Sequence, residues 1–195
     1  MKRTAQIKRK TTETDIALYL NIDGTGKSKV STGIAFLDHM LTLFAKHGLF
    51  DLEIKAKGDL GVDIHHTNED IGISLGEAFK KVLKDKKGIR RFGVGYVVME
   101  EALVRVVLDL SGRYSLNFVE MVKLGETKGY NLRDMKHFLE AFAREAGVNL
   151  SIGIKSGSDT HHVLEALFKA LGRALDEATT LDPRIKGVPS TKGKL

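Results

Sequence analysis

The alternation of apolar and polar residues divides the chain into two halves with the same predicted order of elements. Period-two alternation predicts strands at Ile16–Ile22, Tyr96–Met99 and Ala102–Leu110. Leu, Phe and Ala at helical spacing predict helices at Leu37–Lys46 and Met135–Glu145. After each of these helices comes a short alternating run and then a second helical pattern. Each half is therefore expected to contain a few strands, a helix, a strand and a second helix.

Two repeated motifs relate the halves directly. The pattern H-x-L-x-x-F-A occurs at residues 39–45 and 137–143, and H-H-x-x-E occurs at residues 65–69 and 161–165. The offsets of 98 and 96 residues are about half of the chain, which indicates an internal duplication. We expect an α+β fold of two similar units, each a β-sheet with two helices packed on one face. Residues 1–92 would form the first unit and residues 93–195 the second.

Composition limits the possible chemistry. The 195 residues include no cysteine, which excludes disulfides, thiolate metal sites and a cysteine nucleophile. No apolar stretch approaches the ~20 residues of a membrane helix, and the N-terminal residues lack the apolar segment of a signal peptide. We therefore expect a soluble, cytoplasmic protein without a membrane partner.

The net charge of +6 comes from scattered residues: 31 Lys and Arg stand among 25 Asp and Glu. Nucleic-acid binding predicts a concentrated basic stripe with interleaved aromatics, but only 7% of the residues are aromatic. A small phosphate-bearing partner fits at least as well. The segment Gly24–Ser28 resembles the end of a nucleotide-binding loop, but the pattern needs glycine where the chain has Asn21. We expect this segment to be a hairpin turn between strands.

Six of the seven histidines belong to the repeated motifs. On a helix, residues four apart share a face and adjacent residues do not, so each motif glutamate pairs with only one histidine of its doublet. Two metal sites would use all six. We predict that each site has three imidazoles and one carboxylate, with His65, Glu69, His137 and His162 in one and His39, His66, His161 and Glu165 in the other.

The donor set of nitrogen and oxygen suits Mn, Fe, Co, Ni or Zn, and the sequence leaves the metal open. Any one of these histidines alone is more simply explained as a helix-start or core residue, but six in matched spacing favour metal binding. His47 lies outside the repeat, where contact with a substrate and a surface role are equally compatible with the sequence.

Four segments resemble the imidazoleglycerol-phosphate dehydratase family: residues 36–41 (FLDHML), 65–70 (HHTNED), 158–162 (SDTHH) and 190–193 (STKG). The resemblance extends from about Arg9 to the C-terminus. It implies dehydration of D-erythro-imidazole glycerol phosphate to imidazole acetol phosphate in histidine biosynthesis. It further implies two manganese ions per active site on the same eight ligands, and a homo-oligomer of 24 subunits with active sites at subunit interfaces. The chain has no room for the phosphatase domain fused to some members, so a monofunctional form is expected.

The resemblance also implies roles for individual residues. Glu13 corresponds to a substrate-contacting glutamate, and we expect His39 and His47 to contact the substrate as well. The groups that correspond to phosphate ligands are Arg91, Arg113 and a C-terminal substrate-binding tail with Ser190, Thr191 and Lys192. Arginine offers a planar fork to phosphate oxygens and lysine a point charge. Without the resemblance, both arginines would be interpreted as surface cations and Glu13 as an exposed strand residue.

The mechanistic hypothesis is a metal-dependent elimination of water. The substrate imidazole, held as imidazolate between two cations, would accept electrons as the C–H proton leaves. Loss of hydroxide from the resulting diazafulvene would give an enol that becomes the ketone, with Glu13 as general acid and base. Two alternatives stay open: a dinuclear metallohydrolase of phosphoesters, although no Asp occupies a repeated position, and a metal-dependent scaffold whose histidines join subunits.

Overall fold

The computed structural model describes residues 3–120, 122, 124 and 129–195, and both halves contain the same order of elements. The first half consists of β1 (Thr4–Lys10), β2 (Thr14–Asn21), β3 (Ser28–Ser31), α1 (Ala35–His47), β4 (Asp51–Gly58) and α2 (His65–Leu83). The second half consists of β5 (Phe92–Met99), β6 (Ala102–Asp109), β7 (Ser115–Glu120), α3 (Leu132–Ala146), β8 (Asn149–Ser156) and α4 (Thr160–Thr179). The expected α+β duplication is confirmed; the boundary at residues 92 and 93 stays a prediction.

Each half builds a four-stranded mixed sheet with the same strand order, β1-β2-β4-β3 and β5-β6-β8-β7. The strand at one edge of each sheet, β3 or β7, runs parallel to its neighbour, whereas the other pairs are antiparallel. The predicted hairpin turn at Gly24–Ser28 is therefore wrong, because β2 and β3 are not neighbours. Asp51 at the start of β4 accepts hydrogen bonds from the backbone N–H groups of Thr25 and Lys27, so this loop crosses the end of the inserted strand.

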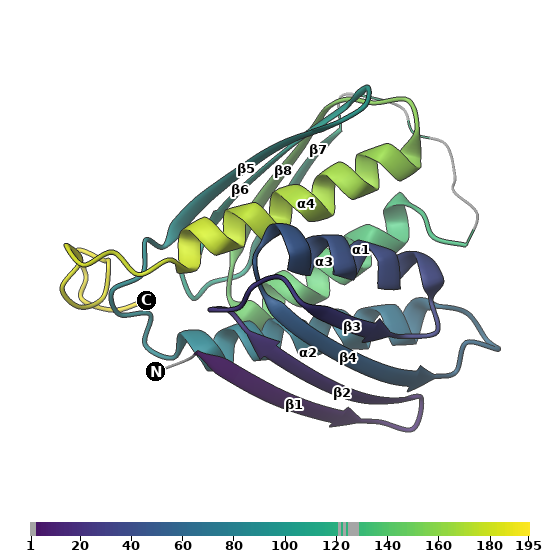
Figure 1. Ribbon diagram of the computed structural model, residues 1–195, viewed down its shortest axis with the longest axis horizontal. Coiled ribbons are helices and arrows are strands. Elements are labelled where there is room, and N and C mark those ends of the chain that lie inside the picture. The colour runs from purple at the N-terminus through teal and green to yellow at the C-terminus, as the bar shows by residue number, and fades with distance from the viewer. Residues whose placement is uncertain (1–2, 121, 123, 125–128) are drawn as a thin grey trace.

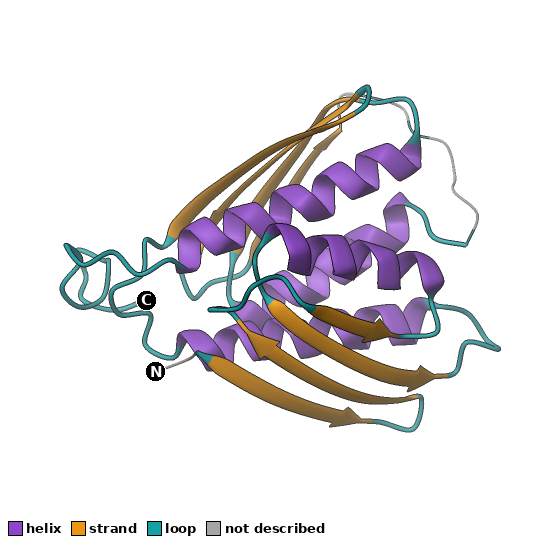
Figure 2. Ribbon diagram, in the orientation of Figure 1, coloured by secondary structure: helices purple, strands orange, loops and turns teal. Residues whose placement is uncertain are grey.

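The four helices lie between the two sheets, as Figures 1 and 2 show. Inward-facing apolar residues of the strands, such as Ile16, Leu18 and Leu20 of β2, are buried beneath them. Each helix pair takes one helix from each half: α1 packs against α4, and α2 packs against α3. Segments from opposite halves of the sequence are thereby brought into contact, and this pairing positions the histidines described below.

Glycines allow the paired helices to approach closely at equivalent places. A Cβ on Gly76 of α2 would lie 2.6 Å from the carbonyl oxygen of Phe142 in α3. A Cβ on Gly172 of α4 would lie 2.5 Å from the carbonyl oxygen of Phe44 in α1. Any side chain at either position would force the helices apart, so both glycines are required by packing rather than by backbone conformation.

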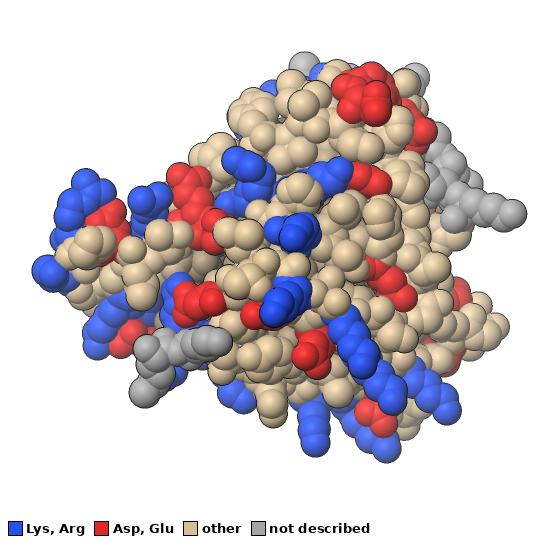
Figure 3. Space-filling model, viewed as in Figure 1, with Lys and Arg blue, Asp and Glu red and all other residues tan. Residues whose placement is uncertain are grey.

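One continuous apolar core joins the helices and both sheets, with Phe44, Phe79, Phe142 and Phe168 fully buried. Helix α3 begins with a capping box between Asn131 and Asp134 and ends at Gly147 in the left-handed conformation. Among the described residues, no helix has the length and apolar character needed to cross a membrane. On the face seen in Figure 3, Lys and Arg side chains alternate with Asp and Glu and form no continuous basic surface.

Candidate metal and substrate site

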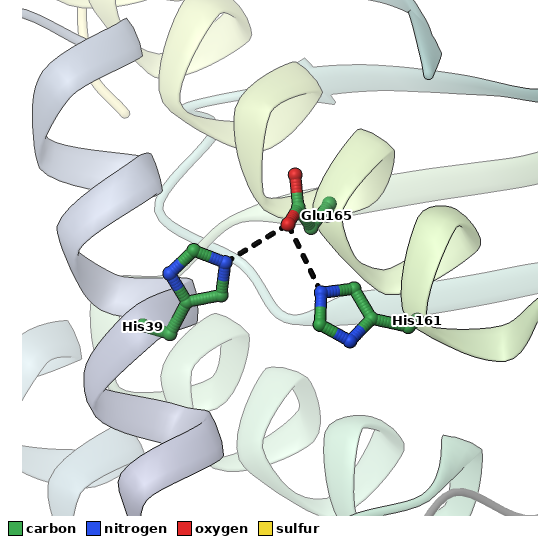
Figure 4. A group of neighbouring side chains, drawn as sticks. All are labelled: His39, His161 and Glu165. Atoms are coloured by element: carbon green, nitrogen blue, oxygen red, sulfur yellow. Dashed lines mark hydrogen bonds and ion pairs between the residues drawn. The ribbon is translucent and has the colours of Figure 1, made fainter. Parts of the chain in front are cut away.

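Two histidines and a glutamate from both halves converge between α1 and α4. We call His39, His161 and Glu165 the Glu165 cluster (Figure 4). The Nε2 atoms of His39 and His161 lie 2.9 and 3.0 Å from the same Glu165 oxygen, Oε1. One ligand atom from each residue lies within 4.8 Å of the others, an arrangement that could hold a metal ion. Helix α4 presents His161 and Glu165 on one face, and α1 brings His39 across from the other half.

Lys169, one turn after Glu165, holds the second oxygen of that carboxylate. Its Nζ donates to Oε2 of Glu165 over 2.7 Å, and both side chains are largely buried. Burial alone would raise the pKa of Glu165, but hydrogen bonds from Lys169, His39 and His161 outweigh it and lower the pKa to about 2. Glu165 is therefore an anion at neutral pH, with Oε1 directed toward the two imidazoles.

The equivalent residues of α2 and α3 form a second, more open group. We call His65, Glu69 and His137 the Glu69 cluster. The distance from Nε2 of His65 to Oε2 of Glu69 is 3.6 Å, and the rings of His65 and His137 meet edge to face with centroids 5.1 Å apart. A shallow cavity of about 170 Å³ adjoins these residues. The side chains of His65 and Glu69 are 45% and 40% exposed, whereas Glu165 is only 10% exposed.

The structure brings together three members of each predicted quartet but not the fourth. The Nδ1 atom of His66 bonds to Oδ2 of Asp59 over 2.9 Å. The Nδ1 atom of His162 bonds to Oε2 of Glu101 over 2.8 Å. Each carboxylate raises the pKa of its histidine through this hydrogen bond. Within one chain, the second histidine of each doublet thus turns away from its predicted quartet.

Glu13 lies in the β1–β2 hairpin, where Oε1 is 3.8 Å from Nε2 of His66. Buried contacts attach this hairpin to α2: the hydroxyl of Thr14 donates to Asp70 over 2.5 Å, and Nε of Arg9 donates to the same carboxylate over 2.8 Å. The Glu13 side chain itself remains half exposed. The hairpin therefore holds a carboxylate beside a predicted metal ligand while leaving it accessible to a bound molecule.

Comparison with known proteins assigns the chain to one enzyme family. The family model described as imidazoleglycerol-phosphate dehydratase matches residues 32–175. The imidazoleglycerol-phosphate dehydratase of Acetivibrio thermocellus is 56% identical over 195 residues and that of Thermoanaerobacter pseudethanolicus 55% over 193, with at least 99% of each chain covered. The chain belongs to the imidazoleglycerol-phosphate dehydratase family. Members of this family are hydro-lyases of histidine biosynthesis, and the resemblance noted from the motifs is confirmed.

Solved structures of the family share the fold. The dehydratase from Staphylococcus aureus superposes with a TM-score of 0.81 at 36% identity, covering 92% of this chain and 99% of that one. The enzyme from Pyrococcus furiosus in complex with (S)-C348 superposes with a TM-score of 0.83 at 37% identity, covering 97% of this chain and all of that one. The duplicated sheet-and-helix architecture is thus the architecture of the family.

Arg91, which the family resemblance implies for phosphate binding, lies far from the histidine doublet of α4 in the same chain. Arg91 donates its backbone N–H to the carbonyl of Ala178, near the end of α4. Because an α-helix rises about 1.5 Å per residue, Ala178 is roughly 25 Å along α4 from His161. The yellow C-terminal segment in Figure 1 lies at this same end of α4.

Contacts within this distant end keep Arg91 in place. Its guanidinium donates to both oxygens of Asp109, over 2.6 and 3.0 Å, and to the carbonyl of Pro189 over 2.9 Å. Ser190, Thr191 and Lys192 follow directly, and the Ser190 hydroxyl accepts from the N–H of Lys192 over 3.2 Å. Arg113 is exposed in the loop before β7. Arg91 and Ser190–Lys192 therefore share one neighbourhood, and Arg113 follows Gly112, where an added Cβ would lie 2.9 Å from the carbonyl carbon of Leu195 at the C-terminus.

His47, at the C-terminal end of α1, faces a basic part of α4. Burial lowers its pKa most, and the nearby cations Lys169, Arg173 and Lys46 lower it further. The imidazole lines a cavity of about 610 Å³ with Lys46 and Arg173. This position lies two turns beyond His39 on α1, and a role in substrate contact stays a prediction.

Sequence reasoning overlooked three charged residues that hold predicted ligands. Lys169 follows Glu165 by four residues, the spacing that favours a helical Glu–Lys pair, and could have been found from that spacing. Glu101 directly precedes β6, as Glu13 directly precedes β2, so alignment of the two hairpins would have indicated it. Asp59 carries no such signal, because its contact with His66 depends on how the loop after β4 folds.

Proposed function

We propose that this protein dehydrates imidazole glycerol phosphate to imidazole acetol phosphate. The observation that carries the proposal is the Glu165 cluster, in a chain of the imidazoleglycerol-phosphate dehydratase family. Histidine and carboxylate donors directed at one point are suited to a divalent transition metal, and an ion with three protein ligands retains positions for a substrate. The Glu69 cluster repeats the same donor types and supports a second ion.

The residues present fit two divalent ions, with manganese expected. One ion would be held by His39, His161 and Glu165 together with a His66, and the other by His65, Glu69 and His137 together with a His162. When bound, the two ions would supply Lewis acidity that favours the imidazolate form of the substrate ring. Glu165 is suited to this task because it is anionic and held at both oxygens.

Glu13 is the candidate acid and base. The hairpin holds the Glu13 carboxylate beside His66. A substrate whose imidazole ring is bound next to that histidine would therefore have its glycerol phosphate carbons near Glu13. A carboxylate there can take the proton from carbon and then protonate the departing hydroxyl. Because the Glu13 side chain is half exposed, its carboxylate can be ionised without the cost of burying a charge, and the proton taken from carbon can be kept or exchanged with water.

We further propose that each active site combines residues from several copies of the chain in a homo-oligomer of 24 subunits. Two features support an assembled site. His66 and His162 are turned away from the clusters of their own chain. The backbone of Arg91 contacts Ala178, roughly 25 Å along α4 from His161, a distance that a five-membered ring with a three-carbon phosphate chain cannot span. Arg91, Arg113 and Ser190–Lys192 of one copy would thus bind the phosphate of a substrate whose ring is held by other copies.

The activity is tested by incubating the metal-depleted protein with imidazole glycerol phosphate, with and without added manganese. Formation of the ketone product only with manganese is expected. Glu53→Gln, an exposed change on β4, serves as the variant control and should behave as the unaltered protein. Absence of metal-dependent ketone would overturn the proposed function, and release of inorganic phosphate instead would indicate phosphoester hydrolysis.

The shared site is tested by complementation. Arg91→Ala and His161→Ala should each be inactive, because one removes a phosphate ligand and the other a metal ligand. Dissociating the two variants together by chelation and reassembling them with manganese should restore part of the activity, since some sites receive both intact groups. Failure of the mixture to exceed either variant alone would contradict a site built from several copies. Native mass spectrometry of the unaltered protein gives the subunit number.

A further inference from the structure

The second histidine of each doublet is held by a carboxylate in the same way. Asp59 bonds to Nδ1 of His66 over 2.9 Å, and Glu101 bonds to Nδ1 of His162 over 2.8 Å. An ionised carboxylate can only accept a hydrogen bond, so Nδ1 of each imidazole must be the donor. In the neutral ring, the lone pair is then on Nε2, the nitrogen directed away from the carboxylate.

We infer that Asp59 and Glu101 are positioning residues that fix the tautomer and orientation of His66 and His162, so that each presents Nε2 to a metal ion. This inference rests on the proposed metal-dependent function. Metal-binding histidines commonly donate their other ring N–H to a carboxylate, which sets the tautomer and strengthens the ligand. His66 and His162 both turn away from the clusters of their own chain. Among the described residues, no ligand of either cluster bonds to their rings to set the orientation, so the carboxylate does it.

The duplication does not supply this arrangement automatically. Asp59 is the residue that directly follows β4, and the residue that directly follows β8 is Gly157, which has no side chain. A Cβ at Gly157 would lie 2.4 Å from the side chain of Val163, so no carboxylate fits there. The second half instead obtains its carboxylate from Glu101, in the β5–β6 turn. The same contact to Nδ1 is thus reached from two non-equivalent positions.

The surroundings of each carboxylate suit this role. The Oδ1 atom of Asp59 is buried and has no hydrogen-bond partner among the described residues. The hydrogen bond of the Asp59 side chain is therefore the one that Oδ2 makes to His66. The Oε1 atom of Glu101 accepts from the backbone N–H groups of Ser158 and Asp159, over 3.0 and 2.8 Å. These bonds leave Oε2 for the histidine and connect the turn rigidly to the start of α4.

The test uses the amides Asp59→Asn and Glu101→Gln. An amide keeps the shape and can still accept through its oxygen from the backbone at residues 158 and 159. Its NH₂ group facing Nδ1 would favour the opposite tautomer, with the proton on Nε2, the nitrogen needed by the metal. The matched controls are Asp63→Asn and Glu100→Gln, since both residues place a negative charge near the same histidines without bonding to their rings.

Metal-depleted full-length protein and each variant are titrated with Mn²⁺ by calorimetry and with Co²⁺ by visible absorption, which reports the ligands around cobalt. Asp59→Asn and Glu101→Gln should each weaken one binding event about 10- to 100-fold and alter the cobalt bands. Asp59→Glu should recover part of the affinity, and the two controls should match the unaltered protein. Circular dichroism and thermal unfolding establish that each variant is folded.

The outcomes separate this inference from the proposed function. If the unaltered protein binds two ions and forms the ketone, while both amide variants retain its affinities and cobalt spectrum, the positioning role is wrong and the function stands. If the unaltered protein binds no Mn²⁺ or Co²⁺, both are wrong. Should Glu101→Gln fail to fold because the start of α4 is disturbed, Asp59→Asn, which touches no helix cap, decides the question.

Discussion

The two halves of the molecule place equivalent residues at equivalent positions and use them differently. Each half has a glutamate directly before the second strand of its first hairpin, Glu13 before β2 and Glu101 before β6. Glu101 accepts hydrogen bonds from the start of α4 and from His162, and the backbone N–H of Asp159 and this histidine keep the pKa of Glu101 well below its usual range. Glu13 lies beside His66 without such bonds. Because Asp59 holds His66, Glu13 is not needed to orient that histidine.

The clusters differ in a related way. Glu165 is buried and bonded to Lys169, whereas the Glu69 side chain is 40% exposed and the residue one turn later is Ile73. The duplication therefore gives both clusters the same ligand types. Differences in the surrounding residues decide that Glu165 is held by a lysine before any metal binds, whereas no lysine among the described residues holds Glu69. A repeated motif identifies the donors but does not show how firmly each is positioned.

The largest expected effect separates the two hairpin glutamates. Glu13→Gln should lower turnover about 10²- to 10⁴-fold, the usual contribution of a general acid or base, with unchanged metal affinity. Glu101→Gln should act first on metal affinity, because its carboxylate contacts a ligand and not the substrate. Steady-state kinetics and metal titration of both variants make the comparison. Near-normal turnover of Glu13→Gln would remove Glu13 from the chemistry.

The next effect tests the advance positioning of Glu165. Lys169→Ile introduces the residue found at the equivalent position of the first half and removes the lysine donor to Oε2 of the buried Glu165 carboxylate. We expect the metal-free protein to lose about 1–3 kcal/mol of unfolding free energy, measured in denaturant. The reciprocal change Ile73→Lys adds a cation beside exposed Glu69 and should alter stability by less than about 0.5 kcal/mol. Equal effects from both changes would show that the clusters do not differ in this respect.

The helix-packing glycines should behave alike in the two halves. Gly76→Ala and Gly172→Ala each place a methyl group against a carbonyl of the partner helix and should cost about 1–3 kcal/mol in unfolding free energy. Gly61→Ala is the control, since a Cβ there meets no atom within 4 Å. A loss at only one of the two helix positions would mean that α1–α4 and α2–α3 are not packed equivalently.

The smallest effect concerns an ion pair of the first half whose arginine also contacts the second half. Arg3 pairs with Asp23, and its Nη1 donates to the carbonyl of Thr179 at the end of α4 over 2.6 Å. Hydrogen bonding to Arg3 lowers the pKa of Asp23 below its ordinary value of 3.8. The pair therefore stabilises the fold above about pH 4, and its contribution is lost as the pH falls through the lowered pKa.

Asp23→Asn removes this dependence. Because the pair is partly exposed, we expect a loss of less than about 1 kcal/mol at pH 7 and a smaller difference from the unaltered protein at more acidic pH. Denaturant unfolding at several pH values between 2 and 7 measures it. A difference that grows toward low pH would contradict the assignment of this pair.

Much of the fold was predictable because its signals are local. The helices at Leu37–Lys46 and Met135–Glu145 lie within α1 and α3, and the repeat correctly indicated two equivalent units. The turn at Gly24–Ser28 was predicted wrongly because glycine-rich composition indicates a reversal of the chain but not which strand pairs next. Insertion of β4 between β2 and β3 depends on pairing between residues that are 24 to 44 positions apart in the sequence.

By itself, the sequence determined the duplication, the donor types and the helix faces that carry them, because periods of two and four residues are properties of the local backbone. Only the tertiary structure decided that α1 packs on α4 and α2 on α3, so that each cluster draws on both halves. Packing decided also that Asp59 and Glu101 reach His66 and His162. Such contacts join residues that no local period relates, since they arise from the shapes of buried surfaces that meet only when the chain has folded.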